Sequence, residues 1–178
     1  MYSIKSPFGD SAALVPHVKR PPVLVWSHDQ EEDHEFSRRL SLAYCAGLFD
    51  GDGCITISKT HTAGRKNPTY RLCLSLVQNC AVTIKRFQSV FDINCSIIDL
   101  PRTVQQNRQV YDLRYDGTNA LQVLTLIRPY LVRKSAEADV AAQFIAQGQM
   151  SVHPGPKGTA PEIWRVREQH YRKLRALK

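Results

Sequence analysis

The chain has 178 residues, of which 43% are hydrophobic, and this is enough to bury one globular core. No apolar run is long enough to span a membrane, and the first twenty residues lack the basic, apolar and small-residue segments of a signal peptide. We therefore expect an intracellular protein that is not secreted. The formal net charge is +8, with −3 over residues 1–35 and +11 over the remainder, so the body suits a polyanion such as nucleic acid; simple solubility is the alternative.

The five cysteines are scattered and odd in number, and they form no CxxC pair. No histidine pair stands at zinc-finger spacing. This pattern favours reduced, partly buried thiols over a disulfide framework or a zinc site.

Residues 1–35 are predicted to be an extended or partly disordered arm, because prolines punctuate them and no hydrophobic period persists. The first strong helical spacing runs over residues 36–49. The sequence DGDG at residues 50–53 is typical of a turn. A main domain is expected over residues 36–150, and a linker with a basic helix over residues 151–178.

The hydrophobic period then changes from helical spacing to strict alternation. Two alternating segments, residues 54–58 and 71–76, flank a polar basic turn and predict a β-hairpin. One face of this hairpin would be apolar and the other polar and uncrowded. In chain order the remaining predicted elements are a helix over 82–91, strands over 96–100 and 110–115, a helix from an N-cap at Thr118 to Leu131, and a helix over 134–147 that ends at Gly148.

These elements predict an α+β fold of order αββαββα, in which the two hairpins form one antiparallel sheet with helices on one face. The adjacent pair Ile97 and Ile98 leaves the facing of the third strand ambiguous. An open sheet face with basic turns fits a DNA groove, since the major groove admits a two-stranded ribbon.

The stretch CAGLFDGDG, residues 45–53, ends the first helix with two acids on a backbone that has few side chains. Together with the two hairpins it resembles the LAGLIDADG homing endonuclease family. Two downstream segments strengthen the resemblance: VQN at 77–79 and IRPYLVRKSAEADVAAQFI at 127–145, which matches the family's Pro-Leu-x-x-Lys helix entry. Within the motif, Phe49 replaces Ile, Gly51 replaces Ala and Cys45 replaces the first Leu. The resemblance covers residues 36–150 and implies the family's saddle-like sheet.

Such a family member would be a site-specific endonuclease that hydrolyses phosphodiester bonds of double-stranded DNA, encoded by a mobile intron or free-standing element. One motif copy implies a homodimer that reads a palindromic or near-palindromic site. The resemblance implies Mg²⁺, with Mn²⁺ able to substitute, and neither a nucleotide cofactor nor a membrane. The alternative is a catalytically silent relative that binds DNA or acts as an RNA-splicing maturase.

The resemblance also implies residue roles. Asp52 would be the metal ligand, assisted by the Gly51 carbonyl, while Gln78 would orient solvent and Lys134 would offset charge at the phosphate. Residues implied at the dimer interface are Ala46, Gly47, Phe49 and Asp50. A basic residue that some relatives carry is replaced by Val82, and Lys85 or Arg86 could substitute for it.

DNA contacts are expected from the polar sheet face and the basic turns, although each side chain could equally be solvated. The amides in this set could read adenine, and the arginines guanine. The candidates are Thr56, Ser58, Arg65, Lys66, Arg71, Ser75, Arg102, Gln105, Gln106, Asn107, Arg108 and Arg114. The terminal helix could hold phosphates with its basic side, or pack Trp164, Tyr171 and Leu174 on the core with that side solvated.

Overall fold

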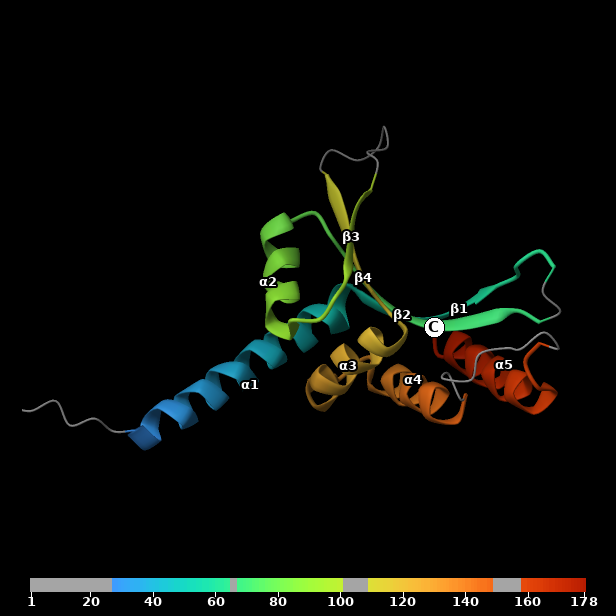
Figure 1. Cartoon of the computed structure of the whole chain (residues 1–178). Coiled ribbons are helices and arrows are strands. Elements are labelled where there is room, and N and C mark those ends of the chain that lie inside the picture. The colour runs from blue at the N-terminus through green and yellow to red at the C-terminus, as the bar shows by residue number, and fades with distance from the viewer. Residues whose placement is uncertain (1–26, 65–66, 101–108, 149–157) are drawn as a thin grey trace, which may run out of the picture.

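The chain is described from a computed structural model, which covers residues 27–64, 67–100, 109–148 and 158–178 (Figure 1). The elements, in chain order, are α1 (Ser27–Asp52), β1 (Gly53–Thr60), β2 (Thr69–Gln78), α2 (Ala81–Phe91), β3 (Ser96–Leu100), β4 (Val110–Asp116), α3 (Gly117–Ile127), the 3₁₀ turn η1 (Arg128–Tyr130), α4 (Ser135–Gln147) and α5 (Pro161–Ala176). The predicted α+β class and the predicted order of helices and hairpins through residue 147 are confirmed.

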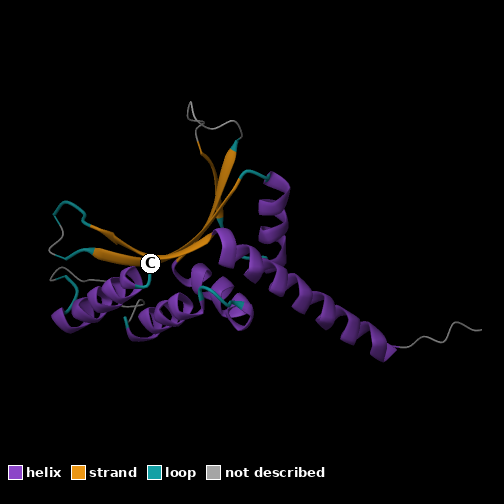
Figure 2. Cartoon of the chain, turned by 180° about the vertical axis from the view of Figure 1, so that it is seen from behind, coloured by secondary structure: helices purple, strands orange, loops and turns teal. Residues whose placement is uncertain are grey.

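The four strands form one antiparallel sheet in the order β1-β2-β4-β3. The sheet is strongly curved, and the helices lie on its convex side while the concave side stays open (Figures 1 and 2). Central register pairs are Ile55 with Leu74 and Leu74 with Tyr115. This arrangement agrees with the predicted sheet that carries helices on one face only.

The convex face of the sheet is the core of the molecule. Alternation in the first hairpin places Ile55, Ile57, Leu72, Leu74 and Leu76 on this face, and all five are buried as expected. Because side chains alternate between faces with a period of two, the polar residues between them must line the open concave side. Burying this apolar set at roughly 2 kcal/mol per side chain is what fixes the strand register.

Helix α1 is longer than predicted at both ends. It begins at Ser27, so the expectation of an extended arm is wrong for residues 27–35. The N-terminal part projects away from the sheet and the other helices (Figure 1), where no core imposes a hydrophobic period on it. At its other end α1 runs through Asp52 and β1 follows directly, so the two acids lie in the last helical turn and not in a separate loop.

Two other local predictions differ from the structure. The N-cap of α3 is Asp116, with Thr118 inside the helix, because Gly117 takes a left-handed φ of 58° and lets the helix begin with its N-cap two residues earlier than predicted. The same helix gives way at Arg128 to the 3₁₀ turn that contains Pro129, whose ring lacks the N–H needed to continue an α-helix.

Helix α5 supports the first hairpin from the convex side. Leu174 is buried, and Trp164 and Tyr171 pack against the core, as in the second of the two predicted arrangements. Glu168 accepts hydrogen bonds from Lys59 at 2.8 Å and from the Tyr70 hydroxyl. These bonds lower the pKa of Glu168 to about 2, so α5 is joined to β1 and β2 by an ionised, nearly buried carboxylate.

All five cysteines are free thiols; four are buried or partly buried as predicted, whereas Cys80 is exposed. Within the described ranges, no helix combines the length and the apolar character that crossing a bilayer requires.

Candidate functional site

Asp50 joins the end of α1 to the start of α4. Its Oδ2 accepts hydrogen bonds from the backbone N–H groups of Val132 at 2.7 Å and Arg133 at 3.1 Å, and its Oδ1 accepts from that of Lys134 at 2.9 Å. Burial raises the pKa of Asp50, but the three backbone donors and the Lys134 ammonium outweigh burial, so the pKa lies below its usual value. Asp50 is therefore a saturated structural acid at the junction of the two helices.

Lys134 reaches back to the same helix end. Its Nζ donates to the Asp50 backbone carbonyl at 2.5 Å, and the residue is only 6% exposed. The last carbonyls of a helix lack partners within the helix and carry partial negative charge, so an ammonium group is favourable there. The ammonium group of Lys134 is therefore held at the end of α1, on the carbonyl two residues before Asp52.

Asp52, the last residue of α1, is exposed and has a different environment from Asp50. Gln78, the last residue of β2, donates from Nε2 to Asp52 Oδ2 at 2.5 Å. Within the described part of the chain, this is the one hydrogen bond to the Asp52 carboxylate, and Oδ1 carries none. The structure therefore brings together three residues predicted for catalysis: Asp52 with Gln78 directly, and Lys134 through the adjoining turn.

Gly53 fixes how closely β1 follows the helix. A Cβ at this position would lie 2.3 Å from Cδ2 of the Phe49 ring, and that ring is 99% buried. A side chain would have to displace the ring or the backbone that carries Asp52. Gly53 does not have a positive φ, so its backbone conformation does not require glycine. The close approach of the Phe49 ring is what requires it.

The concave side of the sheet holds an open hollow of about 620 Å³. Its walls come from the polar faces of three strands and the first turn. The lining residues are Thr56, Ser58, Thr60, Thr62, Thr69, Arg71, Cys73, Ser75, Arg114 and Asp116. Five of the predicted DNA contacts lie here: Thr56, Ser58, Arg71, Ser75 and Arg114. The other seven, Arg65, Lys66, Arg102, Gln105, Gln106, Asn107 and Arg108, lie outside the described residues.

One acid of the concave side escaped sequence analysis. Asp112 is only 2% exposed and binds Arg114 through a carboxylate oxygen, with both the Nε–Oδ2 and Nη2–Oδ2 distances at 2.7 Å. The strict alternation of Asp112, Arg114 and Asp116 along β4 was the signal that would have placed all three on one face.

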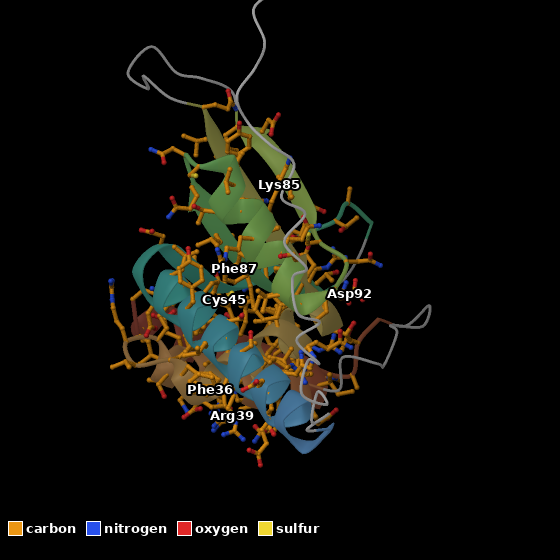
Figure 3. The ribbon with its side chains drawn as sticks, turned by 90° about the vertical axis from the view of Figure 1, so that its left-hand side faces the viewer. Phe36, Arg39, Cys45, Lys85, Phe87 and Asp92 are labelled. Carbon is orange, nitrogen blue, oxygen red and sulfur yellow. The ribbon has the colours of Figure 1, made fainter. Side chains whose placement is uncertain are left out.

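The free side of α1 is apolar. Phe36, Leu40 and Tyr44 recur every four residues and are 64%, 56% and 49% exposed. Gly47 and Gly51 continue the same side, and a Cβ at either would meet nothing within 4 Å. We call these five residues the α1 stripe. Phe36 lies far along α1, away from the contact between α1 and α2 that contains Cys45 and Phe87 (Figure 3).

Three of the four predicted interface residues, Ala46, Phe49 and Asp50, do not belong to the α1 stripe. Ala46 is 0% exposed and Phe49 is 1% exposed, because both point into the core of their own chain. Their side chains therefore cannot contact a partner in this structure, and the expectation is wrong for them. The helix period explains the error: neighbours in the motif, such as Ala46 and Gly47, lie on different sides of the helix.

The basic residues considered as replacements at Val82 lie on α2. Val82 itself is 73% exposed near the start of that helix. Arg86 stands over the ring of Tyr44, with its guanidinium carbon 5.7 Å from the ring centroid. Lys85 is exposed on the outer side of α2 (Figure 3). Arg86 thus contacts the α1 stripe.

The oxygen atoms at the end of α1 suit a hard divalent cation. Asp52 offers an exposed carboxylate with only one oxygen hydrogen-bonded, and the Gly51 carbonyl is among the last of the helix. The described residues contain no group of three or more Asp, Glu, His or Cys side chains that could by themselves enclose a metal. Any ion here would need further oxygen ligands from substrate, water or a second chain.

Comparison with protein-family models found no match, and comparison with curated proteins found none either. Solved structures do match. The homing endonuclease I-CvuI, crystallised with its target in the presence of calcium, is 20% identical with a TM-score of 0.65, over 80% of this chain and 85% of that chain. The archaeal intron-encoded homing endonuclease I-Vdi141I, complexed with DNA, is 10% identical with a TM-score of 0.59, over 82% and 86%.

A third match is the LAGLIDADG homing endonuclease I-GzeII in complex with its DNA target, which is 13% identical with a TM-score of 0.57. It covers 76% of this chain but only 43% of the I-GzeII chain. These matches establish the fold: the chain has the architecture of LAGLIDADG homing endonucleases, as the motif at residues 45–53 predicted.

Proposed function

We propose that the protein is a homodimeric, metal-dependent endonuclease that cuts a specific palindromic or near-palindromic site in double-stranded DNA. The observation that carries this proposal is the placement of Asp52. Its exposed carboxylate ends α1 next to the first residue of β1, whose polar side lines the concave hollow. A duplex bound on the concave side would bring its phosphates to this carboxylate.

The concave side supports DNA as the ligand. Its lining combines Arg71 and Arg114 with hydroxyl groups, which suit phosphate and base edges. The matched structures of I-CvuI and I-Vdi141I are complexes with DNA. The chain body outside residues 1–35 has a net charge of +11, which favours a polyanion.

The α1 stripe supports a second copy of the chain as the partner. Three large apolar side chains at helical spacing are exposed, and two glycines continue the stripe toward Asp52. Small residues allow two helix backbones to approach closely at this end. A two-fold axis through the stripe would bring two Asp52 residues together, one for each DNA strand.

The residues at this end fit a hard cation, and Mg²⁺ is the proposed ion, with Mn²⁺ as a substitute. Asp52 and the Gly51 carbonyl would hold it, and phosphate oxygens and waters would complete its ligand set. When bound, such an ion supplies polarisation of the phosphate and stabilisation of the leaving oxygen.

The protein side chains would contribute positioning and charge. Gln78 fixes the Asp52 carboxylate through a hydrogen bond and leaves its own carbonyl oxygen to orient the attacking water. Lys134 holds a positive charge at the same turn, where it would offset charge that develops on the phosphate. Asp50 would join the end of α1 to the start of α4 through its hydrogen bonds and would take no part in the chemistry.

The test starts with selection of bound duplexes from a random pool in Ca²⁺, followed by addition of Mg²⁺ to the recovered pool. A palindromic consensus cut on both strands is the expected result. A consensus that is bound and left intact would contradict the nuclease and indicate a DNA-binding relative. Failure to enrich any duplex would contradict DNA as the substrate and direct the search to structured RNA.

A further inference from the structure

We propose that Asp112 is a positioning residue for DNA specificity: it holds Arg114 so that the guanidinium reads guanine at one position of each half-site. This inference rests on the proposed function. It concerns the described part of β4, where an acid and a base stand side by side on the open face of the sheet.

Asp112 is a buried acid on the open, polar face of the sheet. The register places Val77 of β2 and Ile98 of β3 directly opposite it, and both are about 40% exposed. These apolar neighbours cover the carboxylate, whose side chain is 3% exposed, against 47% for Arg114. The acid therefore lies beneath the surface and the arginine at the surface.

The geometry of the pair leaves one edge of the guanidinium available. Nε and Nη2 both point to Asp112 Oδ2, so the side edge of the guanidinium is occupied. The end edge, made by Nη1 and the second hydrogen of Nη2, remains for another acceptor. A guanine presents two acceptors, N7 and O6, at the spacing that two parallel guanidinium donors match.

The surrounding charges favour a base over a phosphate at this point. Asp112 and Asp116 flank Arg114 on the same face of β4, and each carries a negative charge. With an acid on either side along the strand, the charge of Arg114 is partly compensated, which weakens its attraction for a phosphate. A neutral guanine edge depends on the hydrogen bonds and not on net charge, so this environment favours a base contact by Arg114 over a phosphate contact.

A purely structural role explains Asp112 poorly. Its Oδ1 is buried and has no hydrogen-bond partner among the described residues. Burying a carboxylate with one unsatisfied oxygen opposes folding. An uncharged residue at this position would serve the packing between Val77 and Ile98 better, so the contribution of the acid lies in the orientation of Arg114.

The experiment profiles base preference by selection from a random duplex pool in Ca²⁺ with the full chain. It compares wild type with Asp112→Asn, Arg114→Ala and the double variant. Asp99→Asn is the matched control, because it removes one negative charge from neighbouring β3 at a register position opposite Tyr111. Arg114→Ala should lower the preference for guanine at one half-site position by about 5- to 150-fold, the range of one bidentate contact.

Asp112→Asn should weaken the same position by about 5-fold or more and leave the others unchanged. In the Arg114→Ala background it should have no further effect there, since the acid acts only through the arginine. Asp99→Asn should leave the profile as in wild type. If Asp112→Asn lowers the melting temperature, Arg114→Lys is used in its place. Lysine keeps the charge but lacks the planar pair of parallel N–H donors, so the guanine preference should fall by a similar factor.

Three results would overturn the inference while the proposed function stands: an unchanged profile in Asp112→Asn, a change at a position that Arg114→Ala does not affect, or a retained guanine preference in Arg114→Lys. Wild type that binds no duplex would overturn the proposed function and this inference with it.

Discussion

Asp50 and Asp52 are two residues apart in the last turn of α1, yet they belong to two different regions of the molecule. Asp50 lies in the junction with α4, where three backbone N–H groups bind its carboxylate. Asp52 lies at the border of the sheet, exposed, with a single hydrogen bond from Gln78. The contrast teaches that two acids of one helical turn can differ in what they leave open: three donors saturate Asp50, whereas Asp52 keeps lone pairs for a further ligand.

The largest effect is expected at the sheet border. Asp52→Asn should lower the DNA cleavage rate by about 10³-fold or more, because the amide removes the charge that would hold the metal. Cleavage of the selected duplex and binding in Ca²⁺ are measured together, and binding should be retained. Unfolding in urea serves as the control and should match wild type. Comparable cleavage by this variant would contradict the assignment of Asp52.

Substitution of Asp50, at the junction of α1 and α4, should change stability more than it changes the chemistry. Asp50→Ala leaves three backbone N–H groups at the start of α4 without their acceptor, so the free energy of unfolding should fall by about 3 kcal/mol. Urea unfolding monitored by circular dichroism measures this loss. A variant as stable as wild type, with cleavage abolished, would mean that Asp50 is chemical and that the contrast is misassigned.

The link between the two regions is Gly53. Gly53→Ala places a methyl group against the buried Phe49 ring, and overpacking of this kind costs about 1–3 kcal/mol. We expect lower stability in urea and slower cleavage, because relief of the clash moves Asp52. Stability of Gly53→Ala equal to that of wild type would refute the close approach.

The smallest effect is the pH dependence of stability. The folded-state pKa values of Asp50 and Glu168 are both lowered, Glu168 from 4.5 to about 2. A lowered carboxyl pKa gives stability that is present above the unfolded pKa and is lost as the pH falls through the folded value. The free energy of unfolding should therefore decrease between about pH 5 and 2.

Glu168→Gln should reduce this acid-induced decrease, measured by urea unfolding at several pH values. Glu32→Gln, at an exposed position on α1, is the control and should not change the slope. An equal slope in Glu168→Gln and wild type would contradict the role of Glu168 in joining α5 to the first hairpin.

Much of the fold was predictable because one face of the sheet is buried. The alternation over residues 54–58 and 71–76 can be satisfied only with Ile55, Leu72 and Leu74 in the core, and the structure places them there. The part of helix α1 that precedes Phe36 was not predictable in the same way. Residues 32–35 are exposed, so no hydrophobic period marks this part of the helix, and its acids are equally typical of an arm.

The site was predictable as a set of residues but not as a set of contacts. The family motif pointed to Asp52, Gln78 and Lys134, and the first two are hydrogen-bonded to each other. That Lys134 binds the Asp50 carbonyl depends on how α4 approaches the end of α1. Asp112 was missed because an acid in a polar strand face looks solvated until the exposed neighbours Val77 and Ile98 are placed around it.

The central claim is that each chain contributes one Asp52, and that each Asp52 cuts one strand. Its most direct test is a heterodimer of wild type and Asp52→Asn, purified through two different affinity tags and incubated in Mg²⁺ with a supercoiled plasmid that contains the selected site. Wild-type homodimer should give linear plasmid, and the heterodimer should stop at the nicked open circle. Linear plasmid from the heterodimer at the wild-type rate would contradict the claim, because one Asp52 would then suffice for both strands.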